Sequence, residues 1–166
     1  LAVARAVEAA APGLCVGLKW PNDLLVGGRK VCGILCETAE RGRVIVGVGL
    51  NVRVRPLDLP PEVRARATAL EAAAGRPLRV ADVADRVVPA VVAAATGAGD
   101  RLDEAALAEL GRRDVLRGRR VRTEAGVMGA AEGIAPDGGL SVRDGSGVVH
   151  TVRAGGVEAI DEVGAP

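Results

Sequence analysis

The chain has 166 residues, of which 49% are hydrophobic and 26% charged, and its formal net charge is +1. This length suits one domain, or a medium and a small domain, and the balanced charge gives no reason to expect nucleic acid or an anionic membrane as a partner. No apolar stretch is long enough to span a bilayer, and the opening residues lack the pattern of a signal peptide. Three cysteines, an odd number, argue against a secreted disulfide framework. The sequence therefore predicts a cytoplasmic protein.

The N-terminal part is predicted to form one helix followed by four strands. Apolar residues have helical spacing over residues 1–11, and Pro12-Gly13 ends the helix. Because the chain opens within helical sequence, we expect it to be a fragment of a longer protein or a trimmed form. Period-two alternation with glycine turns then predicts an antiparallel meander, with strands over residues 14–18, 24–26, 30–38 and 43–52.

Helical periodicity replaces this alternation after a proline-broken loop at 53–61. It predicts helices over residues 62–74, 80–96 and 103–113. Five short segments with glycine turns follow, and they predict a small closed β-barrel of SH3-like size, with strands over residues 118–124, 126–135, 139–144, 147–153 and 156–161. We place a domain boundary near residue 114.

The rarest residue types lie close together in the sequence. Among 22 basic residues only Lys19 and Lys30 are lysines, and the single tryptophan, Trp20, and the only two asparagines, Asn22 and Asn51, lie in the same part of the chain. Lysine is a compact point charge, whereas arginine is a wide planar fork. A chain that otherwise uses arginine is therefore expected to keep lysine only where arginine would not serve.

The segment Lys19-Trp20-Pro21-Asn22-Asp23 is predicted to form a rigid corner between two strands. Pro21 fixes its own backbone and pushes Trp20 toward an extended conformation, while Asn22 and Asp23 have the chemistry of turn residues. Lys19 is then presented from a strand. Its ammonium could neutralise a carboxylate, a phosphate, or the charge that develops between them during group transfer.

A second feature is the pair Gly47 and Gly49, two positions apart in a strand that leads to Asn51. This spacing leaves one face of the strand without side chains, so a ligand or another strand is expected to pack on the backbone. Asn51 lies on the same face, and its amide can donate and accept together, which suits the edge of an adenine base. On spacing alone, a bulge with a capping asparagine is the simpler interpretation.

Together these residues carry a resemblance to a known family. GLKWPNDLLVGGRKVCGILCETAE followed by VIVGVGLNV resembles the central catalytic part of the biotin protein ligases, through KWPNDL, KxxGILxE and GxGxN in this order. GRRVRTE, GIAPDGGLSVRD and an AGG turn resemble the family's small C-terminal domain. The resemblance implies an α+β fold, with a partial class II aminoacyl-tRNA synthetase/biotin ligase-like mixed sheet and helices, followed by a small SH3-like β-barrel. Residues 1–113 would be the catalytic domain without its N-terminal part, whose glycine-rich loop lies upstream, and residues 114–166 the C-terminal domain.

The resemblance also implies an activity. The chain would be an ATP-dependent ligase that activates biotin to biotinyl-AMP and transfers it to a lysine of the biotin carboxyl carrier protein or domain of a carboxylase. The substrates would be ATP and biotin, with Mg²⁺ to screen the triphosphate. A homodimer is a further expectation, because family members often pair through the central sheet. Neither a membrane nor nucleic acid is expected as a partner of this segment.

Individual roles follow residue by residue from the resemblance. Lys19 matches the lysine that contacts the biotin carboxylate and the reacting phosphate, so it is the catalytic candidate. Asn51 matches the asparagine that reads adenine, and Trp20 and Asn22 complete the predicted nucleotide site. The predicted biotin-binding residues are Lys19, Leu24, Gly33, Ile34, Leu35, Gly47 and Gly49.

The remaining candidates for reactive side chains are given structural roles. His150 is the only histidine, so it predicts no metal site. Cys32 and Cys36 share a face of one predicted strand, but their Cα atoms would lie roughly 13 Å apart, too far for a disulfide. We interpret both as buried small hydrophobic residues.

Two alternatives to the ligase remain open. One is a truncated, non-catalytic module that binds biotin or an adenylate, because the upstream glycine-rich loop is absent. The other is a lipoate-type protein ligase or octanoyl transferase on the same scaffold. KWPND and the predicted C-terminal barrel favour biotin over lipoate.

Overall fold

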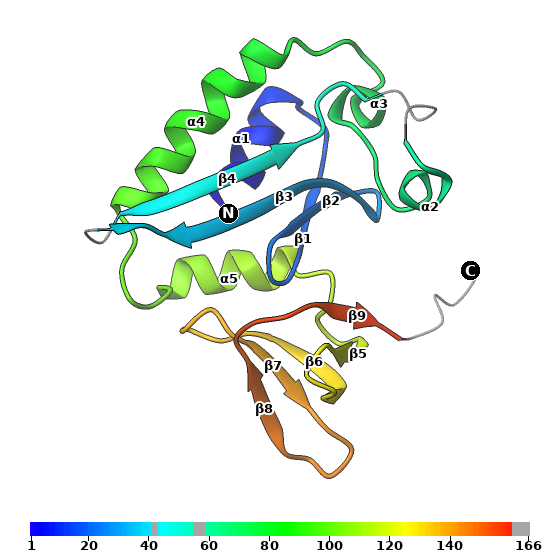
Figure 1. Cartoon of the computed structure of the whole chain (residues 1–166), viewed down its shortest axis with the longest axis vertical. Coiled ribbons are helices and arrows are strands. Elements are labelled where there is room, and N and C mark those ends of the chain that lie inside the picture. The colour runs from blue at the N-terminus through cyan, green and yellow to red at the C-terminus, as the bar shows by residue number, and fades with distance from the viewer. Residues whose placement is uncertain (41–42, 55–58, 161–166) are drawn as a thin grey trace. The chain divides into compact units, whose positions relative to one another are not determined.

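The computed structural model describes residues 1–40, 43–54 and 59–160, and the chain divides into two units (Figure 1). The first unit contains residues 1–18 and 22–98, and the second contains residues 19–21 together with the chain from residue 99 onward. The chain thus leaves the first unit at Lys19 and returns to it at Asn22. Helix α5 (Glu104–Arg113), which the predicted boundary assigns to the first domain, belongs to the second unit.

The first unit is built on a four-stranded sheet whose strands follow chain order. β2 pairs with β3 and β3 with β4, both antiparallel, which confirms the predicted meander. Gly27 and Gly28, with φ angles of 56° and 73°, form the turn between β2 and β3, a left-handed conformation that glycine adopts readily. The strands are β1 (Val16–Lys19), β2 (Asp23–Val26), β3 (Arg29–Thr38) and β4 (Val44–Leu50).

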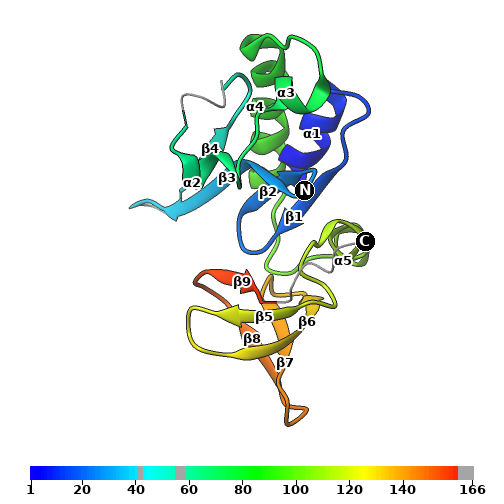
Figure 2. The same ribbon diagram turned by 90° about the vertical axis from the view of Figure 1, so that its right-hand side faces the viewer.

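Helices α1 (Ala2–Ala10) and α4 (Val80–Thr96) pack against each other and cover one face of this sheet (Figure 2). Both agree with the predicted helices. Their alanines and valines meet the apolar residues of β2 and β3 in one core, whose buried members include Val3, Val7, Leu24, Val26, Cys32, Val83 and Val87. The opposite face of the sheet therefore lies away from these helices.

The helix predicted over residues 62–74 is wrong in its middle. The structure has two short helices, α2 (Pro61–Arg64) and α3 (Leu70–Ala74), with residues 65–69 between them. In that interval Lys30 N–H donates to Arg66 O at 2.7 Å, and Thr68 N–H donates to Lys30 O at 2.8 Å. Pairing with the start of β3 thus takes the backbone groups that a continuous helix would have bonded internally.

The second unit combines α5 with a five-stranded antiparallel sheet in the order β8-β7-β6-β5-β9. All five predicted strands are confirmed, while their closure into an SH3-like barrel stays a prediction. Alternate residues of these strands enter a separate core that includes Leu116, Val121, Leu140, Val142 and Trp20. The strands are β5 (Arg120–Thr123), β6 (Met128–Ile134), β7 (Leu140–Arg143), β8 (Val149–Val152) and β9 (Val157–Ala159).

Across the described residues, no helix is both long enough and apolar enough to cross a membrane.

The turn between β7 and β8 is organised by Asp144. One carboxylate oxygen accepts hydrogen bonds from Ser146 N–H at 2.9 Å, Ser146 Oγ at 2.6 Å and Val148 N–H at 3.1 Å, and the other lies 2.6 Å from His150 Nε2. The hydrogen bond from the Ser146 hydroxyl, followed by that from His150, holds the pKa of Asp144 well below its ordinary value. His150 therefore has a structural partner in this turn.

We expect acid to destabilise this turn. A carboxyl whose pKa is lower in the folded than in the unfolded state stabilises the fold above its unfolded pKa, and that contribution is lost as the pH falls through the folded pKa. The urea midpoint of the second unit, followed by the fluorescence of its only tryptophan, should fall between pH 4 and pH 2. The fall should be shallower in Asp144→Asn, because asparagine does not titrate. Equal slopes in both proteins would show that Asp144 is not responsible.

Candidate functional site

The glycines of β3 and β4 share one face of the first sheet. Gly33 lies opposite Gly49, and Leu35 lies opposite Gly47, and residues directly opposite each other on paired strands point to the same side. A Cβ added at Gly47 or Gly49 would meet only neighbouring strand atoms, none closer than 3.7 Å. We call these four residues the glycine face. At Gly47 and Gly49 the backbone is open to a ligand.

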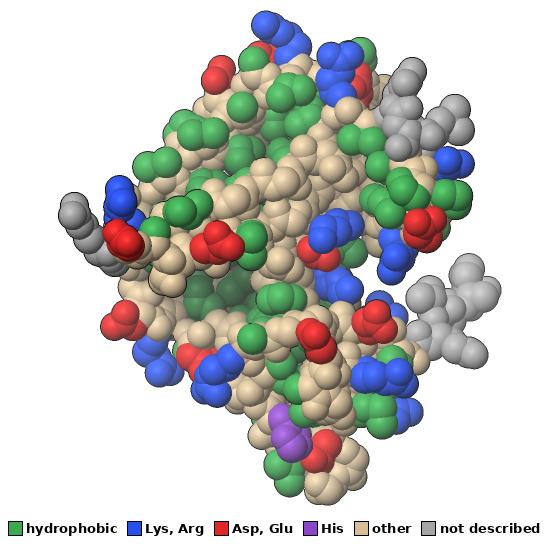
Figure 3. Space-filling view, in the orientation of Figure 1, with side chains coloured by type: hydrophobic (Ala, Val, Ile, Leu, Met, Phe, Trp, Pro, Cys, Tyr) green, Lys and Arg blue, Asp and Glu red, His purple; other side chains and the backbone are tan. Residues whose placement is uncertain are grey.

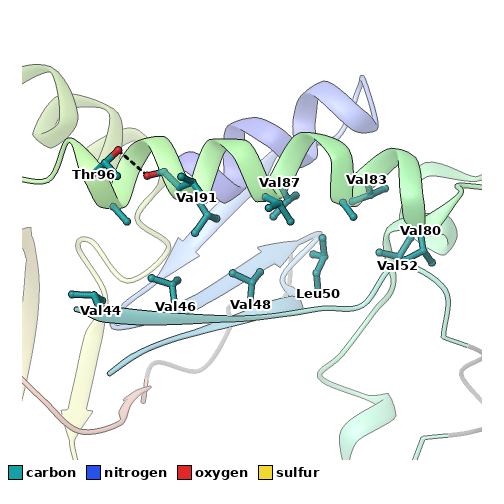
Figure 4. A pocket seen from close by; sticks show the side chains of 14 residues that line it. Val44, Val46, Val48, Leu50, Val52, Val80, Val83, Val87, Val91 and Thr96 are labelled. Atoms are coloured by element: carbon teal, nitrogen blue, oxygen red, sulfur yellow. Dashed lines mark hydrogen bonds between the residues drawn. The ribbon is translucent and has the colours of Figure 1, made fainter. Parts of the chain in front are cut away.

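The other face of β4 is occupied by valines and by helix α4. Val46, Val48 and Leu50 point toward the helix (Figure 4), and between β4 and α4 lies an apolar groove of about 610 Å³. Hydrophobic side chains gather at the surface along α4, where Val88 and Val92 are exposed (Figure 3). The groove has no charged residue in its lining. It offers nothing to bind a carboxylate or a phosphate, so the glycine face is the better candidate.

The structure separates the predicted biotin-binding residues. Gly33, Leu35, Gly47 and Gly49 come together on the glycine face, where the Leu35 side chain is 59% exposed. Leu24 instead lies opposite Cys32, is only 1% exposed and belongs to the core beneath α1 and α4. Ile34 lies opposite Val48 and packs against the same core. Leu24 and Ile34 therefore support the sheet from the side that faces the helices.

Lys19 and Asn22 flank the corner at the end of β1. Lys19 is the last residue of β1 and is half-buried, and its ammonium has no ion-pair partner among the described residues. Asn22 is exposed, and its carbonyl accepts a hydrogen bond from Ile34 N–H at 2.9 Å. This hydrogen bond joins Asn22 to β3, and within the described residues neither the Lys19 nor the Asn22 side chain has a hydrogen-bond partner.

Trp20, predicted to contact the nucleotide, has a structural role. Its indole is 6% exposed and packs in the core of the second unit, where Nε1 donates to Gly138 O at 2.9 Å. Burial of the ring and a satisfied N–H leave no free surface on which a base could stack. The peptide bond between Trp20 and Pro21 is cis.

Asn51 follows β4 and forms hydrogen bonds to the segment at the start of α3. Its Nδ2 donates to Thr68 O at 3.1 Å, its backbone N–H donates to Val31 O at 2.9 Å, and its carbonyl accepts from Leu70 N–H at 2.8 Å. The bulge with a capping asparagine weighed in the sequence analysis is not found: β3 and β4 pair without a register shift, and α3 has no side-chain cap. Oδ1 has no partner among the described residues and remains able to accept a hydrogen bond from a ligand.

An ion pair that sequence reasoning missed lies beside the glycine face. Lys30 Nζ is 2.5 Å from Asp23 Oδ1, and Asp23 lies opposite Gly33 across β2 and β3. The rarity of lysine singles out Lys30 in the sequence, but the register that brings it to Asp23 includes an irregularity between Leu24 and Leu25. Sequence alternation alone could not supply that register.

Cys32 is not an activated nucleophile. Burial raises the pKa of the Cys32 thiol to about 11, so Cys32 stays protonated at neutral pH and is a small hydrophobic residue, as predicted. Cys36 is exposed. The prediction that it is buried is wrong, because the end of β3 that carries it extends beyond the core.

Comparison with known proteins tests the resemblance. The family model described as "Biotin/lipoate A/B protein ligase family" matches residues 1–53. The resemblance to the biotin protein ligases is confirmed. The Bifunctional ligase/repressor BirA of Bacillus subtilis is 42% identical over 92 residues, covering 53% of this chain and 28% of the relative. The Biotin–[acetyl-CoA-carboxylase] ligase of Mycobacterium tuberculosis is 49% identical over 53 residues, covering 32% of this chain and 20% of the relative.

Solved structures show the same fold over nearly the whole chain. The biotin protein ligase of Aquifex aeolicus in complex with biotin and ATP has a TM-score of 0.75 at 23% identity, covering 95% of this chain and 68% of that protein. Its apo structure gives a TM-score of 0.76 and covers 71% of that protein. The chain therefore has the α+β fold of biotin protein ligases, with two antiparallel sheets. It spans about 28% of the length of the Bacillus relatives.

Proposed function

We propose that this chain is part of a biotin protein ligase that activates biotin with ATP and transfers it to a lysine of the carrier domain of a biotin-dependent carboxylase. One observation carries the proposal. The residues that match the family model contain KWPND and GxGxN, and in the structure the glycines of the second motif expose bare backbone. The name of the Mycobacterium tuberculosis relative, a biotin–[acetyl-CoA-carboxylase] ligase, supports the choice of biotin.

In the first step a carboxylate oxygen of biotin attacks the α-phosphorus of ATP. A new P–O bond forms, the bond to the bridging oxygen breaks, and pyrophosphate leaves with that electron pair. The ammonium of Lys19 neutralises the negative charge shared by carboxylate and phosphate, which would otherwise repel each other. Gly47 and Gly49 admit the ligand to the backbone, and Asn51 Oδ1 accepts a hydrogen bond from the adenine amino group.

In the second step a lysine amine of the carrier protein attacks the acyl carbon of biotinyl-AMP. An amide bond forms, AMP leaves, and the amine gives up its proton. Such chemistry depends on positioning and charge stabilisation rather than on a nucleophile of the enzyme. This agrees with a sheet on which the buried thiol is protonated and the only histidine is engaged in a turn of the second unit.

Magnesium has no residue assigned to it in this proposal. Among the described residues there is no group of three or more His, Cys, Asp or Glu side chains that could hold a metal ion. Mg²⁺ is often held largely by the phosphates of its substrate. The ion would therefore arrive with ATP and screen its triphosphate.

The second unit is proposed to be the SH3-like C-terminal domain of the ligase. Its five antiparallel strands, with alternate residues in a single core, support this assignment. Pairing of two copies through the first sheet remains a prediction.

Biotin-dependent exchange of pyrophosphate into ATP tests the proposal. We would measure it for the 166-residue chain and for the same chain joined to the upstream part of the Bacillus subtilis relative, each with biotin and with lipoate. Exchange that requires biotin, in either form, supports the ligase. Exchange with lipoate alone would assign the lipoate-type activity. Binding of biotin without exchange in both forms would indicate a non-catalytic module.

Gly49→Ala should separate ligand binding from folding. The added Cβ would lie 3.7 Å from Gly33 O, an ordinary contact, and alanine in a strand is about 0.5–1 kcal/mol more favourable than glycine. We expect the urea midpoint to stay level or rise, while the affinity for biotin, measured by calorimetry, falls about tenfold or more because the methyl group stands where the ligand meets the backbone. Unchanged affinity would show that the ligand does not lie on the glycine face.

A further inference from the structure

We propose that Lys30 is a second ligand-binding residue, whose ammonium is positioned by Asp23 over Gly33 and binds an α-phosphate oxygen of the nucleotide. The inference rests on the proposed function and adds to it a residue to which the sequence analysis assigns no role. It concerns only the first unit, in which both side chains and the glycine face lie.

The position of the ammonium is fixed by its ion pair with Asp23. Lys30 Nζ is 2.5 Å from Asp23 Oδ1. A Cβ built on Gly33 would lie 3.4 Å from both Cε and Nζ of Lys30, so the end of the lysine lies directly above the bare backbone of Gly33. Asp23 Oδ1 is buried and accepts no hydrogen bond from another described residue. The carboxylate therefore depends on Lys30 and holds it in place.

The ammonium keeps free donors toward solvent. A lysine ammonium has three N–H donors, and the Lys30 side chain is 48% exposed whereas Asp23 is 20% exposed. With one donor directed to Asp23, the others are available to an anionic ligand on the glycine face. A guanidinium is a wide planar fork and would not fit the space above Gly33 in the same way. This gives a physical reason for lysine in a chain whose other basic residues, Lys19 apart, are arginines.

The backbone places Lys30 and Asn51 around the same residue. Thr68, which is 6% exposed, donates its N–H to Lys30 O at 2.8 Å and accepts from Asn51 Nδ2 at 3.1 Å. Asn51 is the residue proposed to bind adenine. The α-phosphate is the part of the nucleotide joined directly to the nucleoside, so it is the phosphate whose place is best fixed relative to Asn51. We therefore assign Lys30 to that phosphate rather than to the biotin carboxylate.

Binding of AMP and of adenosine tests the assignment, because the two differ only in the phosphate. We would titrate each into the 166-residue chain by NMR and take the ratio of the two dissociation constants. Wild type should prefer AMP by about tenfold, the scale of one partly exposed charge-assisted hydrogen bond. Lys30→Met should lower that preference while binding adenosine as wild type does, and the preference that remains is the contribution of Lys19. Arg29→Met, which removes an exposed positive charge one residue away, should keep it.

Each outcome decides the matter. If Lys30→Met keeps the wild-type ratio, Lys30 does not bind the phosphate, although the nucleotide site itself stands. If Arg29→Met lowers the ratio as much as Lys30→Met, the effect is one of general charge and the assignment is wrong. If wild type binds adenosine but does not prefer AMP, Lys30 has no such role. If wild type binds neither compound, the proposed nucleotide site fails, and this inference fails with it.

Discussion

Replacing Lys19 by alanine is expected to lower biotin-dependent ATP–pyrophosphate exchange by about 100- to 1,000-fold, the usual effect of removing one group that stabilises charge in the transition state. The ammonium is proposed to act where a carboxylate and a phosphate, both negative, must approach each other. Lys30 is inferred to bind the α-phosphate alone, whereas Lys19 is assigned to both the carboxylate and the phosphate. The measurement is the initial rate of exchange in whichever form of the protein is active, at saturating biotin and ATP and again below saturation.

Lys19→Ala is expected to change activity without disturbing the fold. Lys19 is half-buried at the end of β1, and its ammonium has no ion-pair partner within the described part of the chain. Lys19→Ala should therefore leave the free energy of unfolding, measured by urea titration, within about 0.5 kcal/mol of wild type, as for most substitutions away from the core. Lys19→Arg keeps the charge on a different shape and should recover part of the rate. A loss of less than tenfold in Lys19→Ala, with folding intact, would remove Lys19 from the chemistry.

The order of elements could be predicted because the signals are local. Alternating apolar residues and paired glycines define the meander, and helical spacing between flanking Gly/Pro segments gives α4 its observed bounds. The prediction failed where distant pairing decides the outcome. Residues 62–74 have helical spacing, yet two short helices form there. The backbone of Lys30 hydrogen-bonds Arg66 O and Thr68 N–H between them. The local sequence of residues 62–74 does not indicate that they pair with the start of β3.

The candidate site was predictable in part for the same reason. Gly47 and Gly49 have the same parity on β4, so their shared face follows from the period of a strand alone, whereas Asn51 comes directly after the strand ends. Gly33 and Ile34 are neighbours and cannot share a face, and the structure places only the glycine beside Gly49. The ion pair of Asp23 and Lys30 depends on an irregular register, which sequence alternation does not specify. Motif matching thus found the right strands but did not sort the residues by face.

The sequence predicts that Trp20 contacts the nucleotide, but in the structure it lies in the core of the second unit. Its replacement has the largest expected effect on stability. Trp20 fills the core of the second unit from a segment far away in sequence, and its N–H bonds Gly138 O. Replacing a buried tryptophan by alanine costs about 3–5 kcal/mol. Small domains have total stabilities near the low end of about 5–15 kcal/mol. Trp20→Ala should therefore bring the second unit close to unfolding.

Urea titration followed by far-UV circular dichroism measures the loss, because the variant has no tryptophan to report on. Trp20→Phe should cost less than Trp20→Ala, because phenylalanine keeps most of the apolar contact and loses the hydrogen bond to Gly138. Met128→Ala, at a β6 position that is 49% exposed, serves as the matched control and should cost less than about 1 kcal/mol. If Trp20→Ala costs no more than Met128→Ala, the indole is not a core residue, and the predicted nucleotide contact of Trp20 returns. If the large loss is found, Trp20 is a core residue that holds the segment next to Lys19 in the second unit. In the KWPND motif the tryptophan then stabilises the fold, whereas the adjacent lysine takes part in the reaction.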